Sequence, residues 1–203
     1  MISATIRLRH KYQMSKLYEH SINYLENDPY GRSPGFIDHH AIGVVNLARL
    51  TGENSLLPTA LLVCCSLGED IVRGFQREDR SWEQLTLDDI GLCFAARSRL
   101  IQEHIQTALH VFAPPVSKQC MDPNRCKSRL NRLLKHLSKY ADALAYPDPV
   151  EITWNVCGPK WDLCEKCFAM VKSRGLEDRK HVWARLPKIF GISDPAAAPG
   201  APD

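Results

Sequence analysis

The sequence predicts an all-α protein, an irregular multi-helix bundle whose C-terminal part is rich in cysteine. Apolar residues recur at helical spacing in several segments, and clusters of Pro and Gly separate those segments. The chain has 203 residues, of which 44% are hydrophobic, so it can bury a core. We expect a helical pair over 1–30, a helical core over 36–115, a helical region over 116–192 and a disordered tail over 193–203.

The first region reads as two short helices within residues 2–26. The pattern breaks near Tyr12, and Ser15 is a plausible N-cap for the second helix. A linker that begins at Asp28-Pro29 follows, because proline lacks a backbone donor and the nearby glycines relax the chain. We therefore expect the pair to be set apart from the core region.

The core region begins with two helices. Asp38 is the predicted cap of a helix that stops at Gly52, and Ser55 is the predicted cap of the next, which Gly68 ends. The second helix has Pro58 in its first turn. Its predicted inward residues are Leu57, Leu61, Leu62 and Cys65.

The strongest predicted helix follows Thr86, which forms a capping box with Asp89. It continues to the Pro114-Pro115 pair and would be about 39 Å long at 1.5 Å per residue. Its helical pattern comprises Ile90, Phe94, Arg97, Ile101, His104, Ile105, Ala108 and Phe112. We expect His104 and His110 to be polar edge residues of this helix rather than metal ligands.

A basic amphipathic helix is predicted after Cys126. Its inward residues would be Leu130, Leu133, Leu134 and Leu137, and its outward residues Arg125, Arg129, Arg132, Lys135 and Lys139. Residues 118–139 contain seven Lys or Arg and one acid, an excess of 7 − 1 = +6. Such an excess is typical of a solvated helix face, and it also suits phosphate or acidic lipid.

A last helix is predicted in the C-terminal region. Its apolar positions are Phe168, Val171, Val182, Trp183 and Leu186, and Pro187 is expected to close it.

Two cysteine pairs carry the clearest functional signal. Cys120 and Cys126 flank a segment that Pro123 and Asn124 predict to be a turn, and Cys164 and Cys167 form a C-x-x-C pair. Structural zinc is usually held by two such pairs in a tetrahedron. The first pair has a five-residue spacer instead of the usual two to four, and 37 residues separate the pairs. We predict a closed structural zinc site made of these four cysteines.

Other interpretations of these residues remain open. The four cysteines could be ordinary thiols, or the C-x-x-C pair could be a redox centre, although the strand-helix-strand pattern of such centres is missing. Cys157 and His136 are spare candidate ligands. Three more cysteines, Cys64, Cys65 and Cys93, are expected in the core. The adjacent His39 and His40 are expected at the surface.

Charged residues near the start and the lack of a long apolar run predict that the chain is neither exported nor membrane-spanning. We therefore expect an intracellular protein, in cytoplasm or nucleus, with reduced thiols. No phosphate loop, nucleophile elbow or H-E-x-x-H motif is found, and a four-thiolate site leaves no open position for substrate. We expect a non-enzymatic protein-interaction module with a protein partner. The alternative is a zinc-stabilised nucleic-acid-binding module that uses the basic helix after Cys126.

Several motifs resemble those of one family. The run His10-Lys-Tyr-Gln-Met14 and the residues to Leu25 resemble the last helical pair of a BTB/POZ domain. The segments 42–50, 56–65 and 185–190, together with the four cysteines, are similar to the helical C-terminal region of many fungal BTB-domain proteins. The resemblance implies a protein-interaction module that dimerises or bridges substrates to cullin-type ubiquitin ligases. The strands and first helices of a complete BTB domain are not represented in this sequence.

Overall fold

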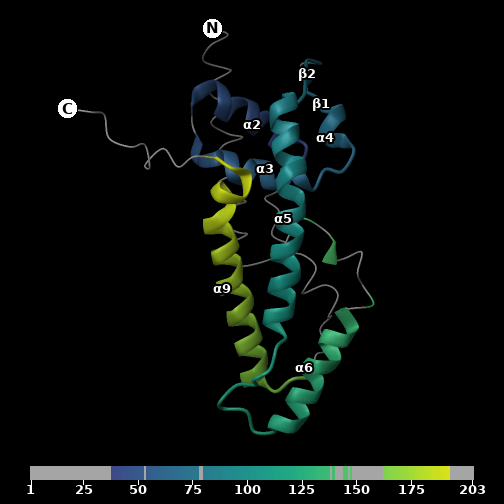
Figure 1. Ribbon diagram of the computed structural model, residues 1–203, viewed down its shortest axis with the longest axis vertical. Coiled ribbons are helices and arrows are strands. Elements are labelled where there is room, and N and C mark those ends of the chain that lie inside the picture. The colour runs from purple at the N-terminus through teal and green to yellow at the C-terminus, as the bar shows by residue number, and fades with distance from the viewer. Residues whose placement is uncertain are drawn as a thin grey trace, which may run out of the picture. The chain divides into compact units, whose positions relative to one another are not determined.

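The computed structural model describes residues 38–52, 54–77, 80–137, 139, 144–145, 147 and 162–192. The predicted N-terminal helical pair, its linker, Cys157 and the predicted disordered tail lie outside the described residues. The described elements are almost all helices, which confirms the all-α prediction (Figure 1). They are α2 His40–Thr51, a 3-10 turn Asn54–Leu56, α3 Leu57–Cys65, α4 Asp70–Arg73, β1 Phe75–Gln76, β2 Trp82–Glu83, α5 Leu87–Val111, α6 Pro123–Leu137 and α9 Glu165–Phe190.

The chain forms two compact units. Of the described residues, those up to Arg97 and those from Ala184 onward belong to one unit, and those from Ser98 to Trp183 belong to the other. Helices α5 and α9 each contribute residues to both units. The predicted division into successive regions along the chain stays a prediction.

Helices α2 and α3 pack together in the first unit. The predicted stop at Gly52 is confirmed, since this residue has a left-handed φ of 73° directly after α2. The predicted side-chain caps are wrong: the caps are His39 and Leu56, and neither makes a side-chain cap bond. Both caps have helical φ and ψ, so the preceding turn already leads the chain into the helix. The predicted inward residues of α3, Leu57, Leu61, Leu62 and Cys65, are all buried.

A small hairpin was not predicted. Strands β1 and β2 pair antiparallel, directly after the one-turn helix α4. Gly74 turns the chain between α4 and β1 with a φ of 76°, and a Cβ there would collide with the carbonyl oxygen of Glu83. The Trp82 indole N–H donates to the Arg73 carbonyl over 3.0 Å. Strands of two residues are too short to show a period of two in the sequence.

Thr86 is confirmed as the cap that begins α5, and both of its bonds with Asp89 run through the Thr86 hydroxyl. The Asp89 backbone N–H donates to Thr86 Oγ1 over 3.1 Å, and that hydroxyl donates to Asp89 Oδ2 over 2.9 Å. Arg49, at the end of α2, donates to Asp89 Oδ1 through Nε at 3.1 Å and Nη2 at 2.7 Å. Asp89, which the cap residue Thr86 bonds, therefore also forms an ion pair with α2, and the Asp89 side chain is buried.

The predicted helical pattern of α5 only partly coincides with its buried side, and the edge position predicted for His104 is wrong. Phe94 is 63% exposed and Ile105 is 37% exposed, whereas His104, predicted at the edge, is fully buried. The side of α5 that is buried carries smaller residues as well as large ones, so the large apolar residues alone do not mark it. The buried residues of α5 are Asp89, Cys93, Ala96, Leu100, His104, Thr107, Ala108 and Val111.

The second unit has a core built from the C-terminal end of α5, the apolar side of α6 and the N-terminal part of α9. Its buried members are Ala108, Val111, Phe112, Leu130, Leu137 and Val171. Leu133 and Leu134 pack against it, so the predicted apolar side of α6 is confirmed. Arg174 of α9 donates to the carbonyls of Ala113 at 2.6 Å and Pro115 at 2.9 Å, which gives the chain leaving α5 hydrogen-bond partners.

Helix α9 does not end at Pro187, as predicted, but continues to Phe190. Its end is a Schellman motif: Ile192 N–H donates to the Pro187 carbonyl at 2.9 Å and Gly191 N–H to the Lys188 carbonyl at 3.2 Å. Gly191 has the left-handed φ of 66° that this motif needs. The glycine, and not the proline, therefore stops the helix.

Candidate metal centre

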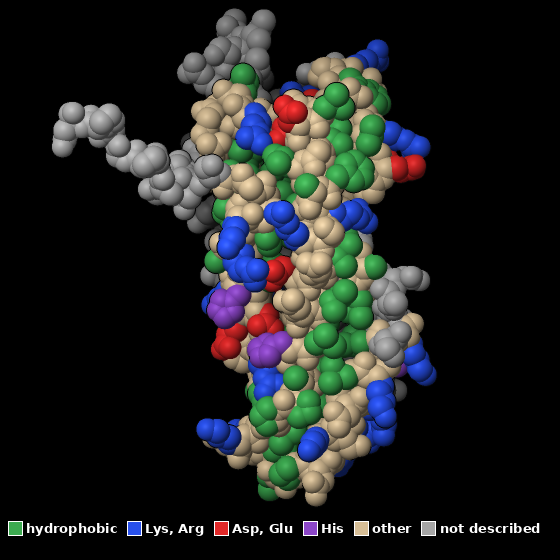
Figure 2. Space-filling view, in the orientation of Figure 1, with side chains coloured by type: hydrophobic (Ala, Val, Ile, Leu, Met, Phe, Trp, Pro, Cys, Tyr) green, Lys and Arg blue, Asp and Glu red, His purple; other side chains and the backbone are tan. Residues whose placement is uncertain are grey.

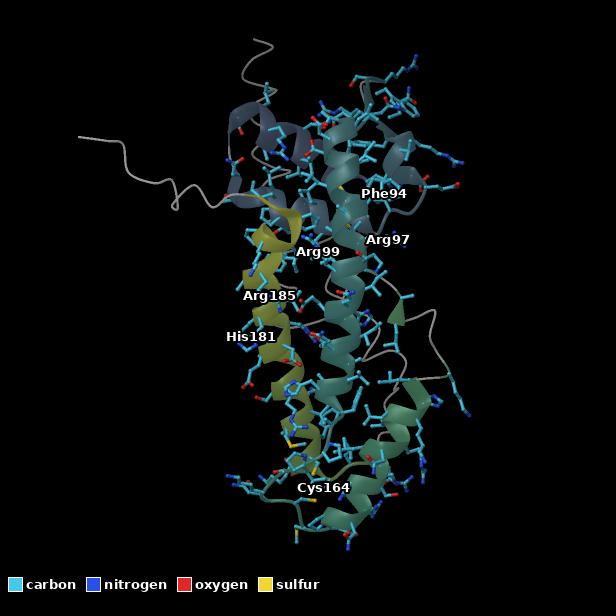
Figure 3. All side chains as sticks on the ribbon, in the orientation of Figure 1. Phe94, Arg97, Arg99, Cys164, His181 and Arg185 are labelled. Carbon is cyan, nitrogen blue, oxygen red and sulfur yellow. The ribbon has the colours of Figure 1, made fainter. Side chains whose placement is uncertain are left out.

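The four predicted cysteines meet in the second unit. The sulfur atoms of Cys120, Cys126, Cys164 and Cys167 all lie within 4.8 Å of one another. Sulfurs of Cys120 and Cys164 are 3.7 Å apart. Zinc bonded to four sulfurs at about 2.3 Å separates those sulfurs by about 3.8 Å in a regular tetrahedron, whereas a disulfide needs about 2.05 Å. The cluster could therefore hold a metal ion. Figure 3 labels Cys164 among the sulfur atoms at the start of α9.

The first pair is built by the start of α6. The predicted turn between Cys120 and Cys126 is wrong, because Pro123 is the first residue of the helix. Asp122 caps that helix: its Oδ1 accepts the Arg125 N–H at 3.0 Å and its carbonyl accepts the Cys126 N–H at 3.1 Å. An Asp before a Pro is a helix-start signal, which explains how a five-residue spacer brings both sulfurs to one point. Cys120 lies before the helix and Cys126 in its first turn.

The second pair is built by the start of α9. Cys164 directly precedes the helix, and its carbonyl accepts the Phe168 N–H at 2.9 Å. Cys167 lies in the first turn and is fully buried. The preceding Leu163 packs against the core of the second unit. Both helices therefore begin at the cluster, where their free N–H groups favour negative charge.

Backbone N–H groups already act on the sulfurs. The Cys167 N–H donates to the Cys164 sulfur and, with further thiol contacts, lowers the Cys164 pKa to about 7. Burial raises the Cys167 pKa to about 12 and also raises the Cys120 pKa, although N–H groups of Ser117 and Asp122 oppose these shifts. A bound cation reverses the burial effect, because it stabilises the thiolates directly.

A carboxylate fixes the chain just before Cys164. Asp162 Oδ1 accepts from Arg125 Nη2 at 2.6 Å, and its Oδ2 pairs with Arg129. The hydrogen bond and charge of Arg125, aided by Arg129, hold the Asp162 pKa below its ordinary value. Asp162 has a left-handed φ of 51°, so these ion pairs fix an uncommon backbone turn. The segment that leads into the second pair is thereby attached to α6.

The remaining cysteines and histidines lie elsewhere. Cys64, Cys65 and Cys93 are buried in the first unit, as predicted. His39 and His40 are partly exposed, in agreement with the surface position predicted for them, and His39 bonds Asp70 at 3.2 Å. Within the described residues, the four-cysteine group is the metal-ligating cluster found, and His136 is not part of it.

Sequence reasoning found the four sulfurs but missed the residues that orient them. The sequence-based prediction gives neither Asp122 nor Asp162 a role. The Asp-Pro pair before the helix was the available signal for the first. For Asp162 the sequence offers no comparable signal, because its arginine partners are 37 and 33 residues away.

Comparisons of the chain with protein families, with curated proteins and with solved structures each found no match. In the part of the chain that the structure describes, no helix combines the length and apolar character needed to cross a bilayer.

Proposed function

We propose that the four cysteines hold one structural zinc ion. The convergence of four thiols at near-tetrahedral spacing supports this most directly. Tetrahedral sulfur sites suit zinc or iron, and a sulfide-bridged iron cluster would hold its ligand sulfurs farther apart. Backbone N–H groups on the sulfurs and two helix starts supply the surrounding donors that such a site needs.

The proposed role of the ion is to stabilise the fold. Four thiolates complete the tetrahedron, so no position is left for a water or a substrate. The ion would join the start of α6 to the start of α9, although 37 residues of chain lie between Cys126 and Cys164. When bound, zinc contributes binding free energy that is also folding free energy. We accordingly assign no catalytic role to this centre.

We infer that the chain as a whole is a non-enzymatic, intracellular protein-interaction module. In the first unit, Leu87 and Phe94 lie seven residues apart on α5, are 85% and 63% exposed, and so share one side of the helix. Exposed large apolar side chains are the kind of residue that protein interfaces bury. The resemblance to the C-terminal part of BTB-domain proteins supports the same function. Figure 3 shows Phe94 pointing outward from α5.

Elemental analysis tests the metal proposal. We expect about one zinc ion per chain after purification without added metal. Chelation should lower the helical circular dichroism signal, and added zinc should restore it. Iron in place of zinc, or no metal with unchanged helicity after chelation, would contradict the proposal.

An interaction experiment tests the module proposal. Wild-type chain and a Phe94→Ser variant are compared by quantitative capture from cell extract. Ala95→Ser is the matched control, since Ala95 is the exposed next residue of the same helix. We expect a protein that binds the wild type and the control but not the Phe94 variant. Equal capture by all three would show that this side of α5 is not the interface.

A further inference from the structure

Helix α6 has a concentration of positive charge without internal compensation. It contains five Lys or Arg residues and no acid over Pro123–Leu137. Like charges three or four residues apart on a helix repel and destabilise it. Figure 2 shows Lys and Arg side chains along the outer margin of this helix. A bound anion would add to the compensation that Asp162 provides for Arg125 and Arg129.

The structure divides these cations into two sets. Arg125 and Arg129 pair with Asp162 and belong to the support of the metal centre. Lys127, Arg132 and Lys135 are exposed. Lys127 flanks the buried side of the helix and Lys135 lies opposite that side, while the charge of Arg132 also acts on Asp162. Two of the residues predicted to point outward from α6, Arg125 and Arg129, therefore have a local structural role.

The exposed set lies beside polar neutral residues in one open depression. Among the described residues, those that line it are all on α6: Asn124, Lys127, Ser128, Asn131, Arg132 and Lys135. Their spacing of three and four residues places them on a single helix face. We call these six residues the outer face of α6. It combines cations that bind phosphate with amides and a hydroxyl that hydrogen-bond to phosphates or base edges.

We propose that the outer face of α6 binds duplex DNA in its major groove. With its side chains an α-helix is about 10–12 Å across, and a major groove about 12 Å wide admits one. This inference rests on the proposed metal centre, which would fix the first turn of α6 through Cys126 and so present the face rigidly.

Other polyanions fit less well. Insertion into an acidic membrane needs the apolar side of the helix, but Leu130 and Leu137 are buried in the core and Leu133 and Leu134 pack against it. Single strands are bound through aromatic stacking, and the outer face has no aromatic residue. The major groove of A-form RNA is too deep and narrow for a helix.

Fluorescence anisotropy with the full chain and a DNA duplex of about 20 base pairs, two helical turns, tests the proposal. Three phosphate contacts predict a slope of log K against log salt of about −2.7. Lys127→Gln, Arg132→Gln and Lys135→Gln together should weaken binding at least about tenfold and flatten the slope. The matched control, Lys172→Gln, Lys180→Gln and Lys188→Gln on α9, makes the same charge change at exposed positions and should bind like wild type within about twofold.

Several results would overturn the proposal: no binding at low salt, equal losses in both triple variants, or equal affinity for single-stranded DNA, duplex RNA, phosphatidylserine vesicles or polyglutamate. Zinc content and helicity are measured on every variant. The outer-face variant should keep about one zinc per chain, because its substitutions remove none of the four sulfurs. Zinc with no DNA binding would refute only this inference, whereas absence of zinc would refute the proposed metal centre.

Discussion

At the residue scale, membership of the four-sulfur cluster, and not burial, distinguishes Cys126 from an ordinary core thiol. Cys126 is 1% exposed within the four-sulfur cluster, and Cys64 is equally buried in the first unit, far along the chain from that cluster. Cys126→Ser should reduce zinc to well below one ion per chain and lower the helical signal. Cys64→Ala, the matched control, should cost about 1 kcal/mol of unfolding free energy and leave zinc content unchanged. Zinc retained by the Cys126 variant would contradict the assignment.

The two half-exposed sulfurs should react differently in those metal-free chains in which the first turn of α9 is still folded. The Cys164 pKa is lowered to about 7, whereas burial raises that of Cys120 above its ordinary value of 9.0. A lowered pKa means that the Cys164 thiolate forms above about pH 7 and is lost as the pH falls through that value. Alkylation of Cys164 should therefore show a midpoint near pH 7, and that of Cys120 one above pH 9.

Peptide mass spectrometry after brief iodoacetamide treatment measures both rates in one sample. In the zinc-loaded protein both cysteines should be protected, which controls for accessibility. A shared midpoint for the two cysteines would show that the Cys167 N–H does not distinguish them.

At the element scale, the cap of α5 is a site of stabilisation that can be isolated. Thr86→Val removes the hydroxyl that accepts the Asp89 N–H and donates to the Asp89 carboxylate. The expected loss is about 1 kcal/mol of unfolding free energy, measured by urea denaturation. Thr86→Ser keeps the hydroxyl and is the control, with a loss of at most a few tenths of a kcal/mol. Equal losses in both variants would mean that packing of the methyl group dominates.

Elements marked by strong local signals were predictable from the sequence. The cap at Thr86 and the left-handed glycine at Gly52 depend on neighbouring residues only, so sequence alone marks them. The buried side of α5 was not predictable in the same way. It is chosen by what packs against the helix, and Phe94 shows that a large apolar residue can be left outside. Local signals thus set where a helix starts, while its orientation needs the rest of the fold.

The candidate site shows the same division. The four sulfurs were predicted from pair spacing, and the structure brings all four together. The ion pairs of Asp162 with Arg125 and Arg129 were not predicted, because a contact between residues more than 30 positions apart leaves no periodic pattern in the sequence. Pro123 was assigned to a turn because Pro favours both turns and the first position of a helix. The preceding Asp122, as the cap, decides between them.

At the scale of the whole molecule, metal removal should affect the two units unequally. The cluster lies within Ser98–Trp183, whereas α2 and α3 pack together in the other unit. Hydrogen exchange after chelation should increase in α6 and in the first turns of α9 by at least about tenfold. Amides of α2 and α3 should exchange at nearly their original rates. Uniform loss of protection would show that the units unfold together, and unchanged exchange everywhere would show that no ion stabilises the second unit.

The joining of α6 and α9 at their starts has a consequence for synthesis. A ribosome releases Cys120 and Cys126 first, and the 37 intervening residues must follow before Cys164 emerges. At about 5–20 residues per second this delay is about 2–7 s. During that interval a nascent chain offers an ion only half of its final ligands. Metal binding is therefore a late event in the synthesis of each molecule, and cellular oxidants have those seconds in which to react with the thiols of Cys120 and Cys126.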